Sequence, residues 1–195
     1  MLVAALSGAT AAKLEMTGAS MEVLIRRATI ADDDALSLVG QATILETYAG
    51  LAAGPDVLAL ALTEHSREFY QALLSDPAVQ IWVAETPTGS SIGYLVLKPP
   101  QGADHGNGAS DVLEVKRIYI LHRFHKLGIG GQLMKAALEA ARLRRARQVV
   151  LTVVDFNDDA LAFYSRFGFS GIGDVAYRAG NTDYHCYTLG IRLPE

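Results

Sequence analysis

The chain has 195 residues, of which 50% are hydrophobic and 19% are charged, and its formal net charge at pH 7 is −4. This length predicts one domain, because domains commonly contain about 100–200 residues. No uncharged apolar run approaches the roughly 20 residues that a membrane-spanning helix needs. The acidic balance disfavours nucleic acid as the main partner. The composition therefore favours a soluble single-domain protein that binds neither membranes nor nucleic acid.

The N-terminal segment differs in composition from the rest of the chain. Residues 1–20 are rich in Ala, Gly, Ser and Thr, and they lack the basic start and long apolar block of a signal peptide. We therefore expect residues 1–20 to be a flexible extension and residues 21–195 to be a single domain. Residues 21–29, MEVLIRRAT, predict its first strand, and the acidic run at 32–34 favours a helix start.

The next part of the chain predicts helices and then two strands. Residues 35–74 contain two or three helical stretches, with breaks near Gly50 and at Gly54-Pro55. Strands are predicted at 79–85 and 91–98. Residues 99–110, PPQGADHGNGAS, have the composition of a flexible loop.

Residues 113–134, LEVKRIYILHRFHKLGIGGQLM, join a strand pattern to a helix pattern. The run at 112–121 is rich in β-branched and aromatic residues, whereas apolar residues later recur at helical spacing, at Leu133, Met134, Ala137, Leu138 and Ala141. A helix that begins near Gly128 has unpaired N–H groups and roughly +0.5 charge at its start. Because the glycines leave room for an anion, the pattern predicts a phosphate or pyrophosphate site.

Basic residues and glycine spacing refine this prediction. Arg123, His125 and Lys126 add actual or potential positive charge beside Gly128. The Walker pattern is absent, and a dinucleotide-binding G-x-G-x-x-G would need a third glycine where Leu133 stands. A tight turn that binds no ligand is the structural alternative.

A second pattern lies at residues 149–169, VVLTVVDFNDDALAFYSRFGF. An apolar strand is followed by a polar break and a short amphipathic helix that ends at Gly168. Asn157 is expected to cap the start of this helix.

These two patterns resemble the GNAT superfamily of acyl-CoA N-acyltransferases. The first signature of that family, R/Q-x-x-G-x-G/A after a strand, matches residues 125–130, HKLGIG, except that His125 replaces Arg or Gln. The second, a strand followed by Asn, Ala, Tyr and Gly-Phe, matches Asn157, Ala160, Tyr164, Gly168 and Phe169. The resemblance spans residues 22–193 and is closest to bacterial spermidine/spermine-type N-acetyltransferases.

The resemblance implies a fold and a cosubstrate. We expect an α/β fold with a mixed, twisted sheet of six or seven strands flanked by helices, and acetyl-CoA as cosubstrate. The pantetheine arm would lie along the predicted strand, with a backbone N–H near Ile120 facing the thioester oxygen. The implied cofactor-binding residues are Ile118, Tyr119, Ile120, His125, Lys126, Leu127, Gly128, Ile129, Gly130, Gly131 and Asn157.

The resemblance also implies catalytic roles for Tyr164 and Glu114. A phenol stays protonated at neutral pH, so Tyr164 could protonate the departing thiolate; the alternative is a core aromatic residue. Glu114 would act as the base, directly or through water, on an ammonium that must lose its proton. Its alternative is a solvent-facing strand residue that pairs with Lys116, since residues two apart share a face.

The expected reaction is transfer of an acetyl group to a primary amine, with polyamines first among acceptors and peptide or protein amino groups second. Candidate amine contacts in the helical region are Glu46, Tyr48 and Glu64, for which exposed helix positions are the alternative reading. A non-catalytic acetyl-CoA sensor remains the alternative function. The oligomeric state is left open, with a homodimer as one option.

The remaining reactive residues indicate no metal site. Cys186 is the single cysteine, so no internal disulfide can form, and its alternating context predicts a buried strand thiol in a protein of the reducing cytoplasm. His122 and His125 have no clustered carboxylate that would complete a metal site. The basic cluster at 142–147 fits a helix C-terminus better than a nucleic-acid site, and Arg166 either reaches a nucleotide phosphate or is solvated.

Overall fold

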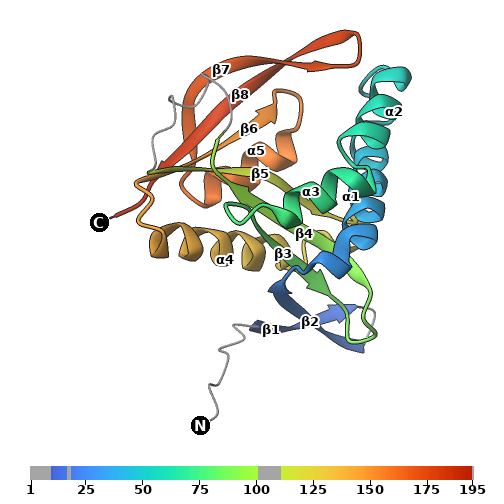
Figure 1. Ribbon diagram of the computed structural model, residues 1–195, viewed down its shortest axis with the longest axis vertical. Coiled ribbons are helices and arrows are strands. Elements are labelled where there is room, and N and C mark those ends of the chain that lie inside the picture. The colour runs from blue at the N-terminus through green and yellow to red at the C-terminus, as the bar shows by residue number, and fades with distance from the viewer. Residues whose placement is uncertain (1–9, 17–18, 101–110, 195) are drawn as a thin grey trace.

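The computed structural model describes residues 10–16, 19–100 and 111–194. These residues form one mixed sheet in the order β1-β2-β3-β4-β5-β6-β8-β7, in which β5 and β6 are parallel and the other neighbouring pairs are antiparallel (Figure 1). The strands are β1 (Thr10–Met16), β2 (Ala19–Arg27), β3 (Gln80–Glu85), β4 (Ser91–Lys98), β5 (Val112–Ile120), β6 (Gln148–Val154), β7 (Ser170–Ala179) and β8 (Thr182–Arg192).

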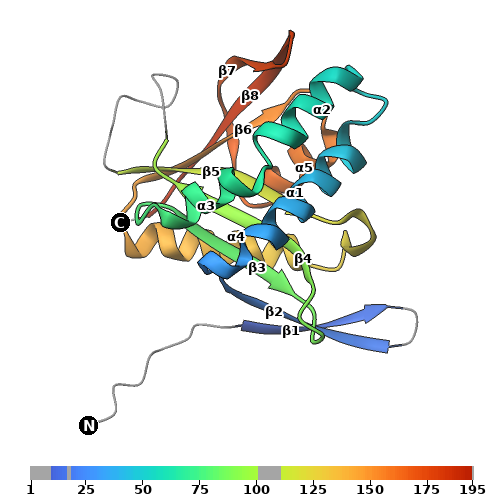
Figure 2. The ribbon, with the colours of Figure 1, turned by 45° about the vertical axis from the view of Figure 1, so that its right-hand side comes forward.

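The expected α/β fold is confirmed, and the sheet has eight strands where six or seven were expected. The difference lies in the N-terminal segment. Residues 10–16 form β1 and pair with β2 in an antiparallel hairpin at the lower edge of the molecule (Figure 2). That part of the predicted extension therefore belongs to the sheet, and β2 begins at Ala19, before the expected domain start at residue 21.

The helices form where the sequence predicts them. They are η1 (Ile30–Asp32), α1 (Asp33–Tyr48), α2 (Gly54–Thr63), α3 (Arg67–Ser75), η3 (His122–Phe124), α4 (Ile129–Leu143) and α5 (Asp158–Arg166). The break between α1 and α2 confirms the predicted interruption near Gly50 and Gly54, whereas the break at residues 64–66, between α2 and α3, was not predicted. Ser66 caps α3 by accepting a hydrogen bond from the backbone N–H of Phe69 at 3.1 Å.

The two faces of the sheet carry different helices. Alternate residues of β3 point to opposite faces, so Trp82 packs in the larger core with α4 and α5, whereas Val83 packs with α1 and α3. A smaller cluster of α1 and α2 residues surrounds Tyr119 of β5. Among the described helices, none is long and apolar enough to cross a membrane.

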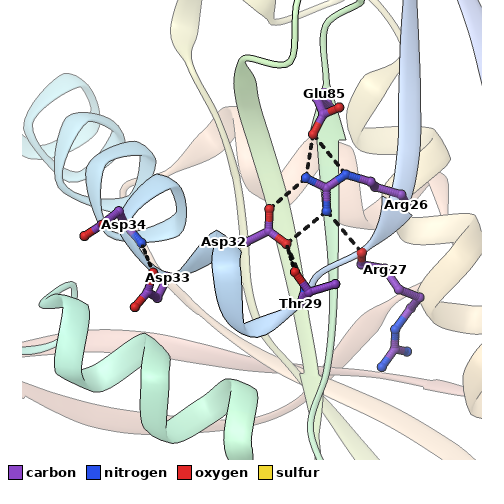
Figure 3. A network of polar contacts seen from close by, with 7 residues as sticks. All are labelled: Arg26, Arg27, Thr29, Asp32, Asp33, Asp34 and Glu85. Atoms are coloured by element: carbon purple, nitrogen blue, oxygen red, sulfur yellow. Dashed lines mark hydrogen bonds and ion pairs between the residues drawn. The ribbon is translucent and has the colours of Figure 1, made fainter.

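An ionic network joins β2, η1 and β3 beneath α1 (Figure 3). The Arg26 guanidinium donates to both carboxylate oxygens of Asp32, at 2.7 and 2.9 Å, and to Glu85 at 2.9 Å. Asp32 also accepts the backbone N–H of Thr29 at 2.7 Å, which completes a capping box. Burial raises the pKa of Asp32, but the hydrogen bonds from Arg26 and Thr29 outweigh it, so the net pKa is below the ordinary value.

Candidate active site

The parallel strands β5 and β6 separate in the middle of the sheet. Their pairing runs from Val112 opposite Gln148 to Glu114 opposite Val150. Beyond that point β5 continues to Ile120 and β6 to Val154 without pairing to each other. This separation leaves the backbone groups on one edge of β5 facing a gap.

The hydrogen bonds at the end of β5 show which groups face this gap. The N–H of Leu121 donates to the carbonyl of Ile92, on the β4 side, at 3.0 Å. Because successive N–H groups of a strand point in opposite directions, the N–H of Ile120 points away from β4 and into the gap. This is the group that sequence reasoning assigned to the thioester oxygen.

The turn that connects β5 to α4 places the start of α4 beside the gap. Gly128 is the N-cap of α4 with φ of 79°, a left-handed conformation that suits glycine, and it offers no side chain to cap the first turn. A Cβ on Gly130 would lie 3.2 Å from Phe163 of α5 and 3.3 Å from Ile120, so glycine permits close packing of α4 there. The first N–H groups of α4 have no partner within the helix, which is the geometry on which the predicted anion site depends.

His125 has a partner within the turn. Its Nε2 lies 2.7 Å from the carbonyl oxygen of Ile120, so this ring nitrogen donates to the end of β5. The imidazole therefore fixes the turn between strand and helix. Its expected phosphate contact would have to use the other ring nitrogen.

A β-bulge in β5 determines which side chains share the face toward α1 and α2. Val96 pairs with Arg117 and Leu97 with Val115, so Lys116 is an extra residue on β5. The bulge reverses the alternation, because residues three apart in a regular strand lie on opposite faces. Glu114 and Arg117 consequently face the same cavity.

That cavity has a volume of about 270 Å³ and lies between α1, α2, β5, β6 and the β7–β8 hairpin. The hairpin reaches toward α2 at the top of the molecule (Figure 1). Its charged and titratable lining residues are Tyr48, Asp56, Glu64, His65, Glu114, Lys116, Arg117, Tyr119, Tyr177, Arg178, Tyr184 and Cys186. The arrangement forms a polar pocket beside the separated strands.

Hydrogen bonds hold the hairpin against α2. The carboxylate of Asp56 accepts the backbone N–H of Asn181 at 3.0 Å and the hydroxyl of Tyr184 at 3.2 Å. Glu64 accepts from the hydroxyl of Tyr177 and from Arg117, whose Nη2 lies at 2.8 Å. These contacts close the outer wall of the pocket.

Three phenols lie together between the pocket and α5. Tyr48 and Tyr119 line the pocket, and Tyr164 of α5 is buried beside them. Burial raises the pKa of Tyr164 above its ordinary value, and the neighbouring Tyr119 adds to the rise. Tyr164 is therefore protonated at neutral pH. Asn157 caps α5, as predicted, by accepting the N–H of Ala160 at 3.2 Å.

Of the three predicted amine contacts, two line the pocket and one does not. Tyr48 and Glu64 line the pocket, whereas Glu46 accepts the backbone N–H of His122 at 2.9 Å and lies outside the lining. Glu114 is buried, with 4% of its surface exposed, and lies 3.6 Å from Lys116. The solvent-facing alternative for Glu114 is therefore wrong, although the pairing with Lys116 exists. Cys186 is buried, as predicted, and also lines the pocket.

Sequence reasoning missed several pocket residues. Asp56, His65, Arg117 and Tyr177 come from α2, the α2–α3 connection, β5 and β7, and no short motif links them. Burial and the charge of Arg117 lower the pKa of His65 to about 3, so this imidazole is neutral. The one available signal was the charged pair Lys116-Arg117, close to Glu114 in a strand whose other residues are apolar or aromatic, which is typical of a bulge or a site.

Comparisons with known proteins agree with this geometry. The family model described as Acetyltransferase (GNAT) family matches residues 46–169, more than half of the chain. An uncharacterised N-acetyltransferase of Escherichia coli, YjgM, is 27% identical over 160 residues, which cover 82% of this chain and 89% of that protein. A spermine/spermidine N(1)-acetyltransferase of Bacillus subtilis is 27% identical over 92 residues, 46% of this chain and 59% of that protein.

A solved structure shares the fold. The PaiA N-acetyltransferase of Thermoplasma acidophilum, in complex with coenzyme A, superposes with a TM-score of 0.69 over 88% of this chain and 99% of that chain, at 19% identity. The turn at Gly128, the separated strands and the family match lead to one conclusion. The chain belongs to the GNAT acetyltransferase family, whose members are N-acetyltransferases with acetyl-CoA as cosubstrate.

Proposed function

We propose that the protein transfers the acetyl group of acetyl-CoA to a primary amine that binds in the pocket of α1, α2, β5 and the β7–β8 hairpin, by direct attack of the amine on the thioester. The observation that carries this proposal is the separation of β5 from β6. The gap adjoins the glycine turn of α4 on one side and the pocket on the other. Donor and acceptor can therefore meet at one place.

The chain's own residues suit the cosubstrate. We assign the pyrophosphate to the first turn of α4 and its approach, His125 to Gly131, where backbone N–H groups and Lys126 offer donors and charge. The free edge of β5, at Ile118, Tyr119 and Ile120, suits the amide groups of the pantetheine arm. Asn157 is assigned a contact to the same arm in addition to its cap.

The proton steps are assigned to two side chains. Glu114 takes a proton from the acceptor ammonium, directly or through water, and the free amine attacks the thioester carbonyl. The N–H of Ile120 stabilises the oxygen that gains negative charge. As the C–S bond breaks, Tyr164, held protonated by burial, donates its proton to the departing sulfur, and the proton that the nitrogen loses in forming the amide restores the phenol.

The role of Glu114 has a direct test. We expect Glu114→Gln to lower kcat/KM by about 10²–10⁴, as is typical for loss of a general base. Glu139→Gln is the matched control, because that carboxylate is exposed on α4 and pairs with Arg142. An unchanged pH–rate profile in Glu114→Gln would remove the residue from the mechanism.

The acceptor is proposed to be a small amine. The Bacillus relative is named for spermine and spermidine, so polyamines enter the assay first, and peptide amino groups second. The decisive experiment mixes the protein, acetyl-CoA and each member of an amine panel and measures free CoA. We expect release with at least one small amine. Tight binding of acetyl-CoA without release from any amine would instead support the sensor function.

A further inference from the structure

The charges that line the acceptor pocket are balanced. Asp56, Glu64 and Glu114 oppose Lys116, Arg117 and Arg178, and His65 is neutral because its pKa is lowered to about 3. A pocket that selects a polycation would be expected to carry excess negative charge. The lining instead offers both signs to a ligand.

The three carboxylates of the pocket differ in how many hydrogen bonds they already accept from the protein. Asp56 accepts two hydrogen bonds from the hairpin, and both oxygens of Glu64 are engaged by Tyr177 and Arg117. Glu114 has Lys116 at 3.6 Å, beyond ordinary hydrogen-bond distance. Of the three, Glu114 therefore has the most capacity to accept from a ligand ammonium.

Arg117 is the buried cation of the pocket. Its side chain is 3% exposed. Its Nη2 donates to the carboxylate of Glu64 at 2.8 Å and to the Glu64 carbonyl at 3.2 Å, and the guanidinium stacks 4.6 Å from the ring centroid of Phe69. These contacts fix the guanidinium in one orientation.

Two nitrogens of this fixed group lack partners. Among the described residues, Nε and Nη1 of Arg117 are buried and make no hydrogen bond of ordinary geometry, and the hydroxyl of Tyr119 lies near the guanidinium. Unpaired donors on a buried, permanently charged group are costly, and native structures rarely leave them so. A ligand oxygen carrying negative charge is the natural partner, since hydrogen bonds between ionised groups are the strongest type, and it reaches these nitrogens when the side chains that cover them move aside.

Resting on the proposed function, we infer that the acceptor is an amine that also carries a carboxylate, with Arg117 binding the carboxylate and Glu114 facing the amine. The β-bulge at Lys116 brings these two side chains to the same cavity. Such an acceptor matches the balanced charge of the lining. Polyamines, which carry no anionic group, would leave Arg117 without its partner.

The first test uses acceptor pairs that differ only in the carboxylate. We compare kcat/KM for alanine with ethylamine and for 4-aminobutyrate with propylamine, and we include spermidine. The expected result is at least a tenfold preference for the carboxylate-bearing member of one pair or both. A preference below tenfold in both pairs, or spermidine as the best acceptor, would overturn the inference and leave the proposed function intact.

The second test changes the guanidinium. We expect Arg117→Met to bring the preference within each pair close to one, mainly through KM of the carboxylate-bearing acceptor. Arg142→Met is the matched control, because its guanidinium lies on α4 outside the pocket lining and pairs with Glu139 at 3.5 Å, and it should keep the preference. Equal loss of preference in both variants would indicate a general charge effect and contradict a specific role for Arg117. Retained acetyl-CoA binding shows that each variant is folded. If Arg117→Met does not fold, the preference of the wild-type protein within each acceptor pair decides the question.

A binding measurement separates this inference from the proposed function. If no amine releases CoA, the proposed function fails, and calorimetry of 4-aminobutyrate binding to the protein–CoA complex then judges Arg117 alone. Binding to the wild type at least tenfold tighter than to Arg117→Met supports the assignment. Equal affinities, or no detectable binding to the wild type, overturn it.

Discussion

At the scale of single residues, Tyr164 shows how environment sets a chemical role. A lone tyrosine on an amphipathic helix is more often a core aromatic residue, and only the family resemblance favours a general acid at this position. The structure buries Tyr164 beside Tyr119, and this environment raises its pKa. A buried phenol that stays protonated is suited to donate to a thiolate.

Tyr164→Phe tests this role. The substitution removes one hydroxyl and keeps the ring that packs against Phe163 and Phe169. We expect kcat to fall by about 10²–10⁴ while the Kd for acetyl-CoA stays within a few-fold, measured by steady-state kinetics and calorimetry. Full turnover in the variant would mean that another group or water protonates the thiolate.

The residues that could be predicted are those whose role depends on local sequence. The cap at Asn157 and the left-handed Gly128 follow from short-range rules, and both appear in the structure. Arg117 could not be predicted, because its position depends on the bulge at Lys116 and its contacts come from Glu64 and Phe69, about fifty residues away in the chain. Pocket residues therefore need the tertiary structure.

At the scale of elements, α1 is placed by close contact with the sheet and with His65. Gly40 lies where a Cβ would clash with Nδ1 of His65 and would lie 2.7 and 2.8 Å from the hydroxyls of Tyr94 and Tyr70. These three side chains are buried and linked by hydrogen bonds, so they have little room to move.

Gly40→Ala is therefore expected to destabilise the fold by about 1–3 kcal/mol, the usual cost of overpacking, as measured by denaturant unfolding. Gly54→Ala is the control, since a Cβ at Gly54 would have no neighbour within 4 Å in the part of the chain that the structure describes. A Gly40→Ala protein as stable as the wild type would show that α1 can shift away from the sheet without cost.

The order of helices and strands could be predicted from the spacing of apolar residues and from the glycine and proline breaks. The edge strand β1 could not. Strand β1 lies in a segment whose composition resembles a linker, and it forms by pairing with β2. The expected loop at 99–110 falls mostly outside the described residues. The splitting of β5 from β6 depends on how three helices and a hairpin pack around them, which no local pattern records.

At the scale of the whole molecule, the Arg26 network makes stability depend on pH. The pKa of Asp32 is lower in the folded state than in the unfolded chain. Its stabilisation is therefore fully present above the ordinary carboxyl pKa near 3.8 and is lost as the pH falls through the lower folded value.

Asp32→Asn should cost about 1–3 kcal/mol of unfolding free energy at pH 7, because a partly buried, charge-assisted network loses its acceptor. The difference between wild type and variant should shrink as the pH is lowered toward 3, as urea unfolding at several pH values would measure. Glu139→Gln, at an exposed site, should show no such difference. If the difference in unfolding free energy between the wild type and Asp32→Asn stays constant with pH, the ionic role of Asp32 is contradicted.

The central claim concerns the whole molecule: the gap between β5 and β6 receives the thioester while the adjoining pocket receives the amine. A crystal structure of the protein with coenzyme A tests it most directly. We predict the diphosphate on the first turn of α4, between His125 and Gly131, and the thiol between Ile120 and Tyr164. Coenzyme A bound elsewhere, or β5 and β6 paired along their full length in the complex, would contradict the account.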